Sequence, residues 1–191
     1  MGRLVLVSGS SGSGKSLFAE RLAAHAADDR FYIATMRPVT EDNRRRIAKH
    51  RRQRAGLGFT TFECPLHVSG APVSAGSAVL LEDLSNLLAN VLFESGGTAD
   101  QVWDDLLGLQ QRCLLLVVVT ISGLSPHGCD AETAAYIDAL NGLNERLLRR
   151  ADAAVRMCCH EPVVCKGDLS DVFKAFPHCS VDIQHCPGSS V

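Results

Sequence analysis

A glycine-rich stretch near the amino terminus constrains the fold more than any other feature. It matches the pattern G-x-x-x-x-G-K-S/T at every fixed position. Its residues are Gly9, Ser10, Ser11, Gly12, Ser13, Gly14, Lys15 and Ser16. Such a loop follows a buried strand and opens a helix, and residues 4–7 and 17–27 have those two patterns.

The chemistry of this loop is phosphate binding. Its backbone N–H groups and the N-terminus of the next helix attract phosphate oxygens. Lys15 would reach the β- and γ-phosphates, and the Ser16 hydroxyl would ligate Mg²⁺. The sequence therefore predicts a site for a nucleoside triphosphate and magnesium. The alternative is a Gly/Ser-rich turn in which Lys-Ser occurs by chance.

Strand and helix patterns alternate along the chain. We expect further strands at residues 31–35, 59–62, 79–81 and 114–120, and a final pair at 154–157 and 162–166. Helices are expected at 40–54, around 86–93, at 103–111 and at 132–150, with a loop at 68–77. This order predicts an α/β fold, a P-loop NTPase-type three-layer sandwich with a mostly parallel central sheet. Residues 1–167 form the predicted domain, and 168–191 a less patterned tail of unknown role.

Composition excludes several classes of protein. The longest apolar run, residues 114–119, is too short for a membrane span, and a strand begins too early to leave room for a signal peptide. We therefore expect a cytoplasmic protein, in which the eight cysteines are mostly thiols. The net charge of −2 gives no general attraction for nucleic acid.

Two acidic residues directly follow the apolar run at 79–81. A phosphate loop needs an acid to hold magnesium, usually at the end of a neighbouring strand. Glu82 is the first choice and Asp83 the second, because Glu82 comes straight after the run. The alternative is a solvated strand end.

The helix expected at 40–54 is strongly basic and contains one histidine. Arg46, His50 and Arg54 follow each other at intervals of four residues and so share one face. His50 could be a nucleophile toward phosphorus, and the arginines would neutralise a triphosphate. A solvated basic helix with an incidental histidine is the alternative. A nucleic-acid patch is disfavoured, because no aromatic residues interleave with the basic ones.

Cysteine and histidine gather toward the carboxyl terminus. Zinc sites often use Cys-x-x-Cys pairs, and none occurs here. Packing thiols and a variable tail are the favoured interpretation. The residues are Cys158, Cys159, His160, Cys165, His178, Cys179, His185 and Cys186.

With these segments in hand, the chain resembles the bifunctional adenosylcobinamide kinase / adenosylcobinamide-phosphate guanylyltransferase family over roughly residues 3–167. The most specific parts are Tyr-Ile-Ala-Thr at 32–35 and Arg-Ile-x-x-His-Arg at 46–51. Other matching parts are the phosphate loop, 61–63, 80–82, 90–93, Asp138, Asn144 and 151–152.

This resemblance implies an activity and a set of residues. Enzymes of the family phosphorylate adenosylcobinamide and then transfer GMP from GTP to its phosphate through a guanylylated histidine, which corresponds to His50. Lys15 and Glu82 would act with it, and Ser16 and Glu82 would hold Mg²⁺. The resemblance implies adenosylcobinamide and its phosphate as substrates, ATP or GTP as phosphate donor, and a homo-oligomer, a trimer. The phosphate loop would bind nucleotide together with Arg46, Arg51, Arg54 and Glu63.

Departures from the family pattern keep two other hypotheses open. The family usually has Thr-Asn-Glu-Val-Gly where this chain has Thr-Ile-Ser-Gly at 120–123, so an acidic side chain is absent. Gly12 stands where an arginine is common, and Ile137 where another is usual. One further hypothesis is a nucleotide-binding module that has lost turnover. The other is a P-loop kinase for a different small alcohol.

Overall fold

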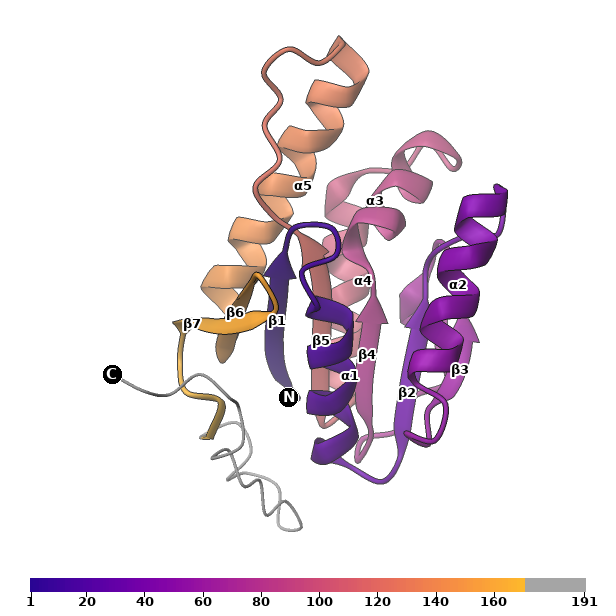
Figure 1. The fold of residues 1–191 in the computed structure, drawn as a ribbon, viewed down its shortest axis with the longest axis vertical. Helices are drawn as coiled ribbons and strands as arrows, with labels where there is room; N and C mark the ends of the chain where they lie inside the picture. Colours follow the sequence, from indigo (N-terminus) through magenta and orange to yellow (C-terminus); the bar gives the residue numbers. More distant parts are fainter. Residues whose placement is uncertain (171–191) are drawn as a thin grey trace.

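A computed structural model gives the structure of the protein, and residues 1–170 are described here. These residues form a seven-stranded sheet in the order β3-β2-β4-β5-β1-β6-β7 (Figure 1). All neighbouring strands are parallel except β6 and β7, which form an antiparallel hairpin. The strands are β1 (Arg3–Gly9), β2 (Arg30–Ala34), β3 (Thr60–Glu63), β4 (Ala78–Glu82), β5 (Leu115–Ile121), β6 (Ala153–Cys158) and β7 (Glu161–Lys166).

Helices cover both faces of the sheet, which makes three layers. In Figure 1, α1 and α2 lie in front of the sheet and α3 and α4 lie behind it. The predicted α/β sandwich with a mostly parallel sheet is confirmed. The helices are α1 (Lys15–Ala26), α2 (Glu41–Gln53), α3 (Leu84–Phe93), α4 (Ala99–Arg112) and α5 (Ala131–Arg150), with a short 3₁₀ helix η1 (Val68–Gly70).

The two central strands β4 and β5 are buried on both faces. Successive side chains of a strand point to opposite faces, so Leu80 joins the cluster under α1 while Val79 and Leu81 join the cluster under α3, α4 and α5. This is why these strands read as continuous apolar runs rather than as alternating ones. No helix within the described part of the chain is long and apolar enough to cross a bilayer.

The two clearest differences from the sequence prediction are the start of one helix and a short 3₁₀ helix inside a predicted loop, while other boundaries shift by one or two residues. Helix α4 begins at Ala99, four residues before Trp103, because Thr98 and Gln101 form a reciprocal capping box. The predicted loop at 68–77 contains η1. Both differences arise from local hydrogen bonds that apolar periodicity does not record.

The cysteines of the β6–β7 hairpin are not packing thiols. Cys158, Cys159 and Cys165 are exposed, whereas Cys113 is buried. The prediction was wrong there because the hairpin ends in the edge strand β7, and its cysteine side chains are exposed in the described structure. Cys179 and Cys186 lie outside the described residues, as does most of the predicted tail at 168–191.

The parallel arrangement brings the loops after β1, β2, β4, β5 and β6 to one edge of the sheet. In the pairing register, Gly9 lies opposite Ile121 of β5 and Met157 of β6, while Ala34 of β2 lies opposite Glu82. The phosphate loop follows β1, so the ends of β5 and then β4 lie on one side of it. The β6–β7 turn lies on the other side.

Replacing Leu81 by alanine tests the importance of this core. Leu81 is fully buried directly before Glu82, so Leu81→Ala should lower the free energy of unfolding by about 2–5 kcal/mol, measured by urea denaturation. The matched control is Leu148→Ala, because Leu148 is 40% exposed on α5. A smaller loss for Leu81→Ala than for the control would contradict the packing described.

Candidate functional site

The phosphate loop folds tightly around its lysine. Gly12 and Gly14 have positive φ values of 75° and 87°, a conformation in which a side chain is strained. Gly14 also precedes α1 as its N-cap residue. Lys15 is buried, and its Nζ donates a hydrogen bond to the carbonyl oxygen of Ser10 at 3.1 Å. The ammonium group is therefore held inside the loop, where phosphate oxygens bind in loops of this kind.

Ser16 and Glu82 are brought together although they lie on different elements. The Ser16 hydroxyl donates to Glu82 Oε1 at 2.6 Å. The second oxygen, Oε2, is buried and has no hydrogen-bond partner among residues 1–170. Burial, with the neighbouring charge of Asp83, raises the pKa of Glu82 to about 8, against the opposing effects of Ser16 and Lys15. A buried, unpartnered carboxylate oxygen of this kind can ligate a cation.

Asp83 has a different task from Glu82. Its Oδ1 caps α3, accepting hydrogen bonds from the backbone N–H of Asn86 at 2.8 Å and from the Ser85 hydroxyl at 2.6 Å. Thr35, the residue directly after β2, holds the same segment in place, since its hydroxyl lies 2.8 Å from both the backbone nitrogen and the carbonyl oxygen of Asp83. Of the two acids considered from the sequence, Glu82 is the one that contacts the phosphate loop.

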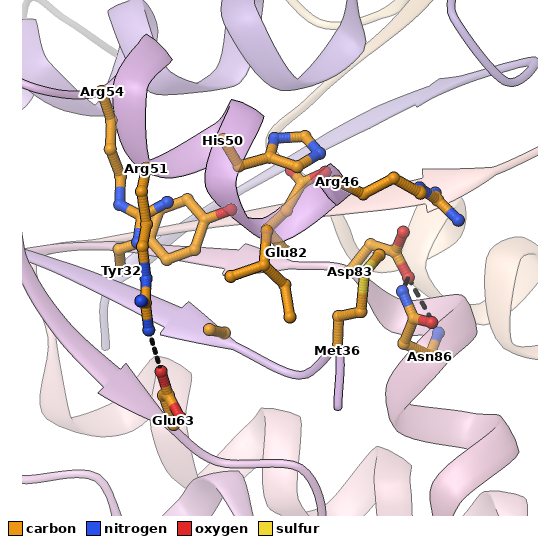
Figure 2. A pocket seen from close by; sticks show the side chains of 12 residues that line it. Tyr32, Met36, Arg46, His50, Arg51, Arg54, Glu63, Glu82, Asp83 and Asn86 are labelled. Atoms are coloured by element: carbon orange, nitrogen blue, oxygen red, sulfur yellow. Dashed lines mark hydrogen bonds and ion pairs between the residues drawn. The ribbon is translucent and has the colours of Figure 1, made fainter. Parts of the chain in front are cut away.

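A pocket opens between α2 and the ends of β2, β3 and β4. Figure 2 shows His50 of α2 lying over Glu82, with Arg46 extending to one side and Arg51 and Arg54 lying on the other. Arg54 directly follows the last residue of α2. The structure thus brings His50 and Glu82 into one pocket of a single chain. The polar and aromatic residues that line it are Tyr32, Arg46, His50, Arg51, Arg54, Glu63, Glu82, Asp83 and Asn86.

The environment of His50 favours the neutral imidazole. Burial and the positive charges of Arg46, Arg54 and Lys49 lower its pKa below the ordinary value, with only Asp83 acting in the other direction. Its Nδ1 is buried without a hydrogen-bond partner in the described structure. A neutral imidazole keeps a nitrogen lone pair, which a nucleophile needs.

The three arginines of the pocket are not equivalent. Arg54 is buried, stacks on the Tyr32 ring at 3.9 Å from its centroid, and donates to the Thr61 hydroxyl at 3.2 Å. Arg51 forms an ion pair with Glu63 at 2.5 Å. Arg46 has no ion-pair or hydrogen-bond partner within the described residues. Arg46 is therefore the arginine most available to an anion.

Glu20 belongs to this neighbourhood and was missed from the sequence. It lies one turn after Ser16 on α1, is fully buried, and its Oε2 accepts a hydrogen bond from Gln53 of α2 at 2.8 Å. Burial raises its pKa, while Gln53 and Arg54 act in the opposite direction. The signal for it was an acid four residues beyond Ser16 on an otherwise apolar helix face.

These features define a class of protein. A phosphate loop between β1 and α1, with a buried acid at the end of β4 beside its serine, makes this a P-loop nucleotide-binding protein.

The comparison with protein families is more specific. The sequence profile described as cobinamide kinase / cobinamide phosphate guanyltransferase matches residues 5–164, and the chain belongs to this family. It is 29% identical to the bifunctional adenosylcobalamin biosynthesis protein CobP of Pseudomonas aeruginosa over 85% of this chain and 97% of that protein. It is 30% identical to the bifunctional adenosylcobalamin biosynthesis protein CobU of Salmonella typhimurium over 78% of this chain and 92% of that protein.

The electrostatic account of His50 predicts how its pKa responds to mutation. In nucleotide-free protein, His50 should titrate below the ordinary histidine value, and Arg46→Met should raise its pKa by removing a positive charge. NMR titration of the imidazole signals measures this, with His50→Gln identifying the resonance. Arg45→Met is the matched control and should leave the pKa unchanged. A His50 pKa at or above the ordinary value would contradict the account.

Proposed function

We propose that this chain phosphorylates the aminopropanol hydroxyl of adenosylcobinamide and then transfers GMP from GTP to the resulting phosphate. The observation that carries the proposal is that His50 lines the same pocket as Glu82, which hydrogen-bonds to Ser16 of the phosphate loop. A nucleophile and a triphosphate site thus share one edge of the sheet. Membership of the family and the names of both relatives support the same activity.

In the kinase step, the loop holds the donor and Lys15 neutralises charge on its β- and γ-phosphates. The substrate oxygen forms a bond to the γ-phosphorus, the bond from that phosphorus to the bridging oxygen breaks with release of the nucleoside diphosphate, and the hydroxyl proton passes to solvent. Because the contacts from the phosphate loop are to phosphate oxygens, which ATP and GTP share, either nucleotide can be the phosphate donor.

The residues present fit Mg²⁺. Magnesium prefers oxygen ligands, and Ser16 Oγ lies beside a Glu82 carboxylate with an unpartnered buried oxygen. We propose that Ser16 and Glu82 hold the ion. When bound, it would supply charge neutralisation for the phosphates.

In the transferase step, His50 is the nucleophile. A nitrogen of its neutral imidazole bonds to the α-phosphorus of GTP while the bond to pyrophosphate breaks, which leaves a guanylylated histidine. A phosphate oxygen of the substrate then bonds to that phosphorus and the nitrogen–phosphorus bond breaks. Arg46 is placed to offset the developing negative charge, and Arg51, Arg54 and Glu63 shape the pocket around the nucleotide.

The proposal extends to assembly and location. We propose a homotrimer in the cytoplasm. The resemblance to the family supports the trimer, and the free cysteines of residues 1–170 fit a reducing compartment. Light scattering coupled to size-exclusion chromatography would measure the mass directly.

One observation favours a second candidate, a module that binds nucleotide without turnover. Where the family usually has an acid at the end of β5, this chain has Ser122, whose N–H donates to the Gly9 carbonyl at 3.3 Å. That candidate requires saturable nucleotide binding without a product from either half-reaction.

Labelling tests the nucleophile. Incubation with Mg²⁺ and GTP labelled at the α-phosphate should leave acid-labile label on the wild-type chain and none on His50→Ala, because only His50 can form the nitrogen–phosphorus bond. His67→Ala is the matched control and should label normally, since the side chain of His67 is 79% exposed. Label on His50→Ala, or none on wild-type protein that binds GTP, would refute the guanylylated His50.

Calorimetry tests the magnesium ligands. Glu82→Gln should reduce the gain in GTP affinity that Mg²⁺ provides by at least about tenfold, roughly 1.4 kcal/mol, because an amide replaces the carboxylate. Binding in EDTA should change little. Glu63→Gln is the control, since Glu63 pairs with Arg51 instead. If Mg²⁺ increases the GTP affinity of folded Glu82→Gln as much as that of the wild type, Glu82 is excluded as a magnesium ligand.

A further inference from the structure

The turn between β6 and β7 lies directly against the phosphate loop. Strand β6 pairs with β1 up to the register of Gly9 with Met157, so the turn begins where the loop begins. At Gly14, a Cβ atom would meet His160 Cδ2 at 3.1 Å and the His160 Cα at 3.7 Å. The imidazole of His160 is therefore a neighbour of the phosphate loop, on the side opposite to Glu82.

The backbone of this turn is strained. Cys159 and His160 have φ values of 50° and 72° and form the two-residue connection between the strands. Hairpin connections with two positive φ values favour Asn and Gly, because other side chains are strained there. His160 is also exposed, with no hydrogen-bond or ion-pair partner in the part of the chain that the structure describes. Folding alone gives no reason for a histidine at this position.

The two half-reactions require two orientations of the donor nucleotide, because a different phosphorus atom reacts in each. The pocket with His50 is on the β4 side of the loop and the His160 turn is on the β6 side. We assign the acceptor hydroxyl to this pocket, so the γ-phosphate faces it during phosphorylation and the nucleoside extends the other way, toward β6. For guanylylation, the α-phosphate must face His50, so the nucleoside lies on the β4 side.

We propose that His160 is a nucleotide-binding residue that contacts the nucleoside end of the donor in the phosphorylation orientation and not in the guanylylation orientation. This inference rests on the proposed function, because it assigns the two half-reactions to two orientations of a triphosphate on one loop. A planar imidazole beside the loop can pack on a nucleobase or ribose. Its exposure and lack of a protein partner leave the ring available for this contact.

Kinetics of the two half-reactions test the proposal. In phosphorylation of adenosylcobinamide, His160→Ala should raise KM for ATP and GTP at least about fivefold, the lower end for aromatic–base stacking, with kcat within about twofold. Guanylylation of His50 from labelled GTP should proceed at the wild-type rate. His127→Ala is the matched control, a histidine in the loop before α5.

A second variant separates binding from folding. His160→Asn suits the positive φ and should keep or raise the melting temperature while showing the same rise in KM. An unchanged KM in both His160 variants would overturn the proposal. An equal loss of activity in phosphorylation and in guanylylation would also overturn it.

Failure of the proposed function would be recognised separately. If wild-type protein neither phosphorylates the corrinoid nor labels His50, calorimetry with GTP and with inorganic tripolyphosphate still tests the contact. His160→Ala should then weaken GTP binding and leave tripolyphosphate binding unchanged. An equal effect on both, or on neither, would overturn the assignment of His160 to the nucleoside.

Discussion

The hydrogen bond between Ser16 and Glu82 joins the phosphate loop to the centre of the sheet, and the rest of the site depends on it. Glu82 ends a strand that is buried on both faces, so its carboxylate has little access to water. An ionised carboxylate in such a place is costly unless a positive group offsets it, which is why its pKa is raised. The fold thus buries a carboxyl group whose ionised form a bound cation would stabilise. The neighbouring Lys15 and Ser16 determine where that cation would lie.

Helix α2 carries His50 and is held in a different way. It buries no residue of its own and is positioned by polar contacts: Gln53 to Glu20, Arg51 to Glu63, and Arg54 beyond its end on Tyr32. Exposed ion pairs contribute little stability, so the buried Glu20 and the stacked Arg54 are the stronger restraints. The position of the nucleophile therefore depends on a few side chains rather than on a hydrophobic face.

This contrast explains what the sequence could reveal. The strand, loop and helix around Lys15 were predictable because apolar runs and fixed glycines record them locally. Glu82 could be preferred to Asp83 because it directly follows a buried run. The contacts of Glu20, Thr35 and Tyr32 could not be derived from the sequence, since their partners lie on elements far away along the chain. The turn at Cys159 and His160 has no composition signal for a hairpin, because it lacks the usual Asn or Gly.

A single phosphate loop that supports attack at both the γ- and the α-phosphorus cannot select between them by itself. Its N–H groups, lysine and serine hydroxyl recognise phosphate oxygens and carry no information about which end bears the nucleoside. Selection must come from groups on either side of the loop. On the β4 side the chain has the arginine-rich pocket with His50, and on the β6 side a strained turn whose imidazole has no partner among residues 1–170. The asymmetry of these two flanks is the physical means by which one loop could serve two reactions in succession.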